Sequence, residues 1–107
     1  MRIKISEEYT RTPGGRYITE GDFSGEAFRK NVLKEKYMAA LELKETLIID
    51  MDGCYGFPSS FLEEAFGGLA RDLNDKNILK NIDIISFDEP GMSERIKSYV
   101  ENAINKR

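Results

Sequence analysis

The serine pair Ser59-Ser60 stands between Pro58 and an apolar run, and its hydroxyl groups suit either capping a helix or accepting a phosphate. Glu63 follows Ser60 by three residues, which is the spacing of a capping box. In that motif the Ser60 hydroxyl accepts the Glu63 N–H, and the Glu63 carboxylate accepts the Ser60 N–H. Ser59 is not explained by these bonds. A cap or loop packing is the favoured role of the pair, and a phosphate switch is the alternative.

Asp50 and Asp52 form a second group with chemical potential, because they follow the apolar run "TLII". An apolar strand followed by Asp-x-Asp-Gly resembles the first motif of haloacid-dehalogenase-like phosphatases. The resemblance implies Asp50 as a phosphorylated nucleophile and Asp52 as a general acid, with magnesium and further acidic ligands on later strands. Little chain follows Asp50, so a polar loop that closes a buried strand is the favoured interpretation.

Composition excludes several classes of function. The 107 residues include 16 Lys and Arg against 19 Asp and Glu, with no dense basic run, so we expect no binding to nucleic acid. The chain has no histidine and one cysteine, Cys54, which excludes Ser-His and Cys-His nucleophiles, zinc sites and an internal disulfide within one chain. We expect no cofactor or metal. No signal peptide or span of roughly 20 apolar residues is recognisable, so we expect no membrane contact and a cytoplasmic location.

The elements that must position these residues alternate between strand and helix patterns. Residues 2–5 alternate as in a strand, and Tyr17-Ile18, after the turn signal at 13–15, predict a partner strand in an N-terminal hairpin or neighbouring pair. The Gly14-Gly15-Arg16 turn indicates positive φ, with anion binding as the alternative. Ser24 is a good N-cap for a helix over 25–43, with a kink or a second short helix after Val32.

The second half of the chain is more regular. Residues 46–51 predict a central strand, residues 60–73 a helix, and residues 81–87 another strand. The segment 91–107 predicts a helix that buries Met92, Ile96, Val100, Ala103 and Ile104. The whole chain, 1–107, is then one small α/β domain with a mostly parallel sheet of about four strands and about three packed helices. Loops at the carboxyl ends of such strands form the expected working surface.

The segment "IIDMDGCYGFPSSFLEEAFGGL", with "GGR" and "SGEAFR" upstream, resembles a STAS-like domain family whose function is largely unassigned. It resembles, more distantly, bacterial anti-sigma factor antagonists of the STAS class. In those proteins a strand ending in Asp-x-x-Gly is followed by a loop, a serine pair and a helix, and a partner kinase phosphorylates the first serine. The resemblance places Asp50 and Gly53 at the loop start and implies phosphorylation of Ser59. It also implies a protein partner, either a histidine-kinase-like ATPase or a protein that this ATPase controls.

We therefore expect a non-enzymatic regulatory domain that acts by protein-protein interaction, with phosphorylation of Ser59 as an optional off switch. The alternatives are the phosphohydrolase that uses Asp50 and Asp52 and, more weakly, a nucleotide-binding module. The expected contact surface consists of Asp52, Gly53, Tyr55, Phe57, Pro58, Ser59, Phe61 and Glu64.

Overall fold

Three short parallel strands form the sheet: β1 (Arg2–Lys4), β2 (Leu47–Asp50) and β3 (Ile82–Ile85), in the order β1-β2-β3. The computed structural model describes residues 1–75 and 77–105. Ile49 of β2 lies beside Ile3 on one side and Ile84 on the other. The strand expected at 46–51 is therefore central, because β1 and β3 pair with its two edges.

One helical rod precedes β2 in the sequence and a second rod follows it. Each rod contains a wide π-helical turn. The first rod comprises α2 (Gly25–Phe28), the π-helical η2 (Arg29–Leu33) and α3 (Lys34–Leu43), so the irregularity expected near Val32 is a π turn. The second rod comprises α4 (Ser59–Leu62), the π-helical η3 (Glu63–Gly67) and α5 (Gly68–Leu73). The remaining helical elements are α1 (Ile5–Glu8), the 3₁₀ turns η1 (Ile18–Glu20) and η4 (Ile78–Asn81), and α6 (Met92–Asn105).

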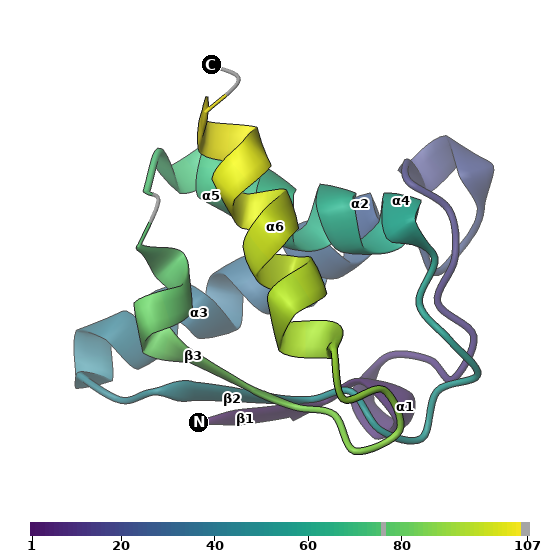
Figure 1. Ribbon diagram of the computed structural model, residues 1–107, viewed down its shortest axis with the longest axis horizontal. Helices are drawn as coiled ribbons and strands as arrows, with labels where there is room; N and C mark the ends of the chain where they lie inside the picture. The colour runs from purple at the N-terminus through teal and green to yellow at the C-terminus, as the bar shows by residue number, and fades with distance from the viewer. Residues whose placement is uncertain (76, 106–107) are drawn as a thin grey trace.

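The rods and α6 all lie on one face of the sheet, where they enclose the core (Figure 1). Ile3, Leu47 and Ile49 are fully buried on that face, beneath Phe61 and Phe66 of the second rod. The face of α6 predicted to be buried is confirmed at Met92, Ile96, Val100 and Ala103. Residues 106 and 107, expected at its end, lie outside the described residues. None of the helices within 1–75 and 77–105 is long and apolar enough to cross a membrane.

The predicted N-terminal strand pair is wrong. β1 ends at Lys4, α1 begins at Ile5, and Tyr17 is the N-cap of η1 rather than part of a strand. The Glu20 carboxylate accepts the backbone N–H groups of Arg16 and Tyr17, both at 2.8 Å. Because this closed turn uses groups that a sheet would need, the described part of the chain has three strands rather than about four.

Candidate functional site

The loops after β2 and β3 meet at the carboxyl edge of the sheet and are bonded to each other. The Asp52 carboxylate accepts the backbone N–H groups of Phe87 at 3.0 Å and Asp88 at 2.8 Å. The Asp88 carboxylate accepts the Gly53 N–H at 3.0 Å in return. Charge-assisted bonds of this kind are stronger than neutral ones, so the two loops hold one another in a fixed shape.

The loop after β2 is also attached to the segment that follows α1. The Tyr55 N–H donates to the carbonyl oxygen of Arg11 at 2.8 Å, and the Cys54 thiol donates to that of Thr10 at 3.4 Å. Burial raises the pKa of the Cys54 thiol, so it stays protonated near neutral pH. Cys54 is therefore a packed loop residue rather than a reactive one.

Two aromatic side chains project from these fixed loops. Tyr55 and Phe87 are each 85% exposed, more than any other large apolar side chain in the described residues. Tyr55 belongs to the surface expected from the sequence, whereas Phe87 was missed because the pattern over 81–87 placed it inside a strand. An aromatic residue directly after a strand end was the signal that could have identified it.

Three residues of the expected contact surface are buried instead. Phe61 is fully covered, and its ring centroid lies 5.8 Å from that of Phe28 and 5.9 Å from that of Phe57. Phe57 and Glu64 are also buried. The apolar rings gain more from burial in the core than the loop gains by exposing them. Gly53, Tyr55, Pro58 and Ser59 stay exposed, and Asp52 is half-buried.

The predicted capping box of Ser60 and Glu63 is also wrong. The helix begins at Ser59, Pro58 is the N-cap, and no side chain caps this end. The Glu63 carboxylate instead accepts hydrogen bonds from the guanidinium groups of Arg16 and, at 2.6 Å, Arg71. Two full positive charges attract the carboxylate more strongly than one backbone N–H does, which draws Glu63 away from the helix start.

Ser59 lies beside two side chains of α6. Its hydroxyl is 3.5 Å from a guanidinium nitrogen of Arg95, which also donates to the Phe57 carbonyl oxygen at 3.2 Å. The pKa of Tyr99 is lowered, mainly by a hydrogen bond with Ser59 and to a smaller extent by one with Arg95. Arg95 and Tyr99 are four residues apart on one helix face, but the sequence does not show which loop that face meets.

Asp50, the last residue of β2, is paired with two basic side chains of β1. One carboxylate oxygen accepts the Asp52 N–H at 3.0 Å, and the other lies 3.1 Å from Arg2 and 3.2 Å from Lys4. Burial raises the pKa of this carboxyl, but these bonds and charges outweigh burial and lower it. Within 1–75 and 77–105, no group of three or more Cys, Asp or Glu residues is arranged to hold a metal. The bonds of both aspartates are explained without catalysis, and the phosphohydrolase remains a prediction.

A buried ion pair joins the two π-helical turns. Arg29 of η2 donates to a carboxylate oxygen of Glu64 at 2.5 Å and to the Glu64 carbonyl oxygen at 2.6 Å, and its Nε donates to Asp72 at 3.0 Å. A Cβ atom at Gly68 would collide with the Arg29 guanidinium. The space left by Gly68 therefore admits Arg29 to the interface, which explains one residue of the Gly67-Gly68 pair.

Arg16 occupies the turn for which anion binding was the alternative. Gly15 has φ +85°, as the turn pattern predicts. The Arg16 guanidinium bonds to Glu63 and lies 3.6 Å from Glu64. Its charge is thus balanced by carboxylates of this chain.

Stability should fall in acid partly through Glu63. Burial raises the pKa of this carboxyl, but the bonds to Arg71 and Arg16 outweigh burial and lower it below 4.5. A carboxyl whose pKa is lower in the folded protein than in the unfolded protein stabilises the fold at pH values above its unfolded-state pKa. This stabilisation is lost as the pH falls through the folded-state pKa. We expect Glu63→Gln to lower Tm at pH 7. On acidification below about pH 4.5, the Tm of this variant should fall less than the Tm of the wild type. Thermal scans from pH 7 to pH 3 measure this, and a constant Tm difference would contradict it.

Most of the region that carries this site matches a known protein family. Residues 24–92 match the model of the STAS-like domain of unknown function (DUF4325). No curated protein matches the chain, and no solved structure does. The matched range runs from Ser24, the N-cap of α2, to Met92, the first residue of α6, and contains β2, β3 and the loops that follow them. Because the match covers more than half of the chain, the protein belongs to the family of STAS-like domains of unknown function (DUF4325).

Proposed function

We propose that this domain is a regulatory module that docks onto another protein through Tyr55 and Phe87, a surface termed here the aromatic edge. The exposure of these two side chains carries the proposal, because both rings are 85% exposed on loops that are already fixed. Exposed aromatic residues are favoured at the centres of protein interfaces. A fixed loop also loses little conformational entropy when it binds.

The family resemblance suggests the partner, a histidine-kinase-like ATPase or a protein that it controls. Asp88 beside Phe87 is exposed, so a partner surface with apolar pockets and a basic rim complements the aromatic edge. Docking of this kind needs no catalytic step in the domain itself.

Ser59 offers a route for regulating this docking. A phosphate there would carry about −1.5 to −2 charges next to Arg95. Arg95 is bonded to Glu89 at 2.7 Å, within the loop that presents Phe87. In the proposed switch the phosphate competes with Glu89 for the guanidinium and loosens that loop, so that Phe87 no longer has a fixed position.

The experiment that tests the function is a calorimetric titration of the purified ATPase partner with wild type and variants. The double variant Tyr55→Ser/Phe87→Ser should bind about 30-fold more weakly, since each truncation of a central aromatic costs about 1 kcal/mol or more. Leu43→Ser is the matched control, because Leu43 is 60% exposed at the end of α3 and outside the aromatic edge. Equal weakening by both changes would exclude the aromatic edge as the docking surface.

The same titration separates the switch from the docking. Ser59→Asp should bind more weakly than Ser59→Ala, because only the carboxylate competes for Arg95. Equal affinities of these two variants would remove the switch and leave the docking intact.

A further inference from the structure

Side chains cover the outer edge of β1, which is one of the two edges of the sheet. Along β1, the Lys36 ammonium lies 3.5 Å from the carbonyl oxygen of Arg2, and the Glu8 carboxylate accepts the Lys4 N–H at 2.6 Å. Lys36 and Glu8 also pair with each other at 3.3 Å. The charged pair covers backbone groups that another strand would need, which is a common protection of edge strands.

The outer edge of β3 lacks this protection. The Met51 N–H donates to the Ile85 carbonyl oxygen at 2.8 Å, so the Ile85 carbonyl points toward β2. Because backbone groups alternate in direction along a strand, the N–H and C=O of Ile84 point away from β2. Neither group has a hydrogen-bond partner among residues 1–75 and 77–105. An extended backbone is the chemical complement of such an edge.

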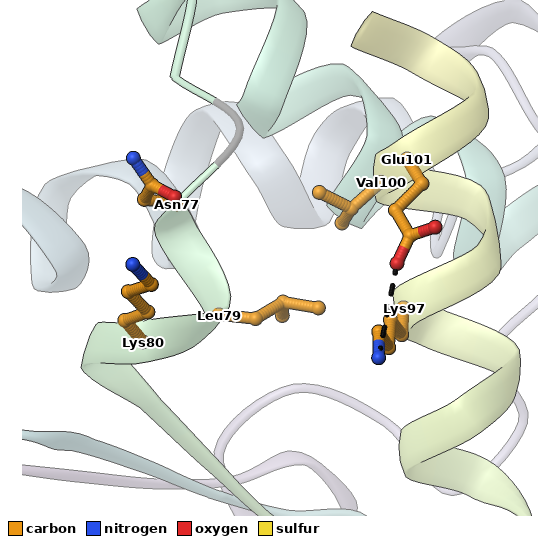
Figure 2. A pocket seen from close by; sticks show the side chains of 6 residues that line it. All are labelled: Asn77, Leu79, Lys80, Lys97, Val100 and Glu101. Carbon is orange, nitrogen blue, oxygen red and sulfur yellow. Dashed lines mark ion pairs between the residues drawn. The ribbon is translucent and has the colours of Figure 1, made fainter. Parts of the chain in front are cut away.

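A pocket lies above the same edge, on the face of the sheet that the helices cover. It has a volume of about 310 Å³ and lies between η4 and α6, with Leu79 and Val100 as its apolar walls (Figure 2). The ion pair of Lys97 and Glu101, 3.9 Å apart, lies on its α6 side. η4 leads directly into β3, and Ile84 is only half-buried at this edge. A side chain that points upward from an added strand would enter this space.

We infer that β3 binds an extended segment of another protein, which adds a fourth strand and places one apolar side chain in the pocket between η4 and α6. Successive side chains of a strand point to opposite faces, so the neighbours of the inserted residue face the open side of the sheet. There Asp83 is exposed and has no ion pair among the described residues. The bound segment therefore alternates apolar and basic residues.

A second copy of this chain fits the edge less well. An antiparallel pair of β3 strands centred on Asp83 would place the two carboxylates opposite each other, and like charges in that position are destabilising. β3 has only four residues, so pairing of edges alone would bury far less than the roughly 1,200 Å² typical of a stable interface. A peptide that also fills the pocket has neither disadvantage.

An eight-residue peptide of alternating Lys and Val tests the inference. Titration followed by amide hydrogen exchange should show slower exchange of the Ile84 N–H in the bound protein. Asp83→Lys should weaken binding about tenfold or more and should instead favour a peptide of alternating Glu and Val. Asp22→Lys, which makes the same charge change on the exposed loop between η1 and α2, should leave the affinity unchanged.

Three results would overturn the inference. The first is an Ile84 amide whose exchange is not slowed at saturating peptide. The second is equal weakening of binding by Asp83→Lys and Asp22→Lys. The third is sedimentation of the protein alone as a dimer with a protected Ile84 amide, which would assign the edge to a second copy. None of these results depends on the aromatic edge, since Tyr55 and Phe87 are unchanged in all these variants.

Discussion

Arg29→Met is expected to lower the free energy of unfolding by about 3–5 kcal/mol, because it leaves the Glu64 carboxylate buried without its main partner. The side chains of Arg29 and Glu64 are only 8% and 10% exposed, and their closest contact is 2.5 Å. Arg16 and Arg71 lie 3.6 and 3.9 Å from the same carboxylate, and they compensate for part of the loss. Denaturant titration followed by circular dichroism measures the change.

The neighbouring lysine provides the control for this variant. Lys30→Met removes a side chain that is 53% exposed and pairs with Glu26 one helical turn away. Exposed pairs contribute about 0.2–1 kcal/mol, so this change should cost less than 1 kcal/mol. The double variant Arg29→Met/Glu64→Met should recover much of the loss, because no unpaired charge is then buried. Similar losses for Arg29→Met and Lys30→Met would show that the pair does not hold the two rods together.

The ion pairs connect parts of the chain that lie far apart in sequence. Arg29 joins η2 to η3, and Arg16 attaches the turn before η1 to Glu63 of η3. Both π-helical turns contribute a partner to the buried pair, Arg29 from η2 and Glu64 from η3. π turns often occur at functional positions, but here their residues serve the packing of one rod on the other. The buried pair thereby fixes the two rods against each other.

Strong periodicity made some elements predictable and weak periodicity did not. The apolar run at 46–51 and the helical spacing at 60–73 extend over several residues, and the structure has β2 and the second rod there. Tyr17-Ile18 offers only two residues of pattern, which a strand and a 3₁₀ turn satisfy equally. The Glu20 carboxylate decides between them by closing the turn.

The candidate site shows a different limit, because its contacts are long-range. Glu63 has the spacing of a capping box, but its partner Arg16 is 47 residues away, and local sequence rules do not include such a competitor. Arg95 and Phe87 come from the last third of the chain, and their contacts with Ser59 and Asp52 span 36 and 35 residues. The sequence therefore included Tyr55 and Ser59 in the candidate site but not the residues that hold or accompany them.

Phe61→Ala is expected to lower the free energy of unfolding by about 3–5 kcal/mol, since it removes a fully buried ring that packs against Phe28 and Phe57. Phe87→Ala should change stability by less than about 0.5 kcal/mol, because that ring is 85% exposed. Binding of the partner should respond in the opposite way: Phe87→Ala weakens it, whereas Phe61→Ala, measured at a temperature where the variant is folded, leaves it nearly unchanged. Denaturant titration and calorimetry on the same two proteins measure both effects. If Phe61→Ala kept its stability and lost only binding, Phe61 would belong to the contact surface, as the sequence pattern alone suggests.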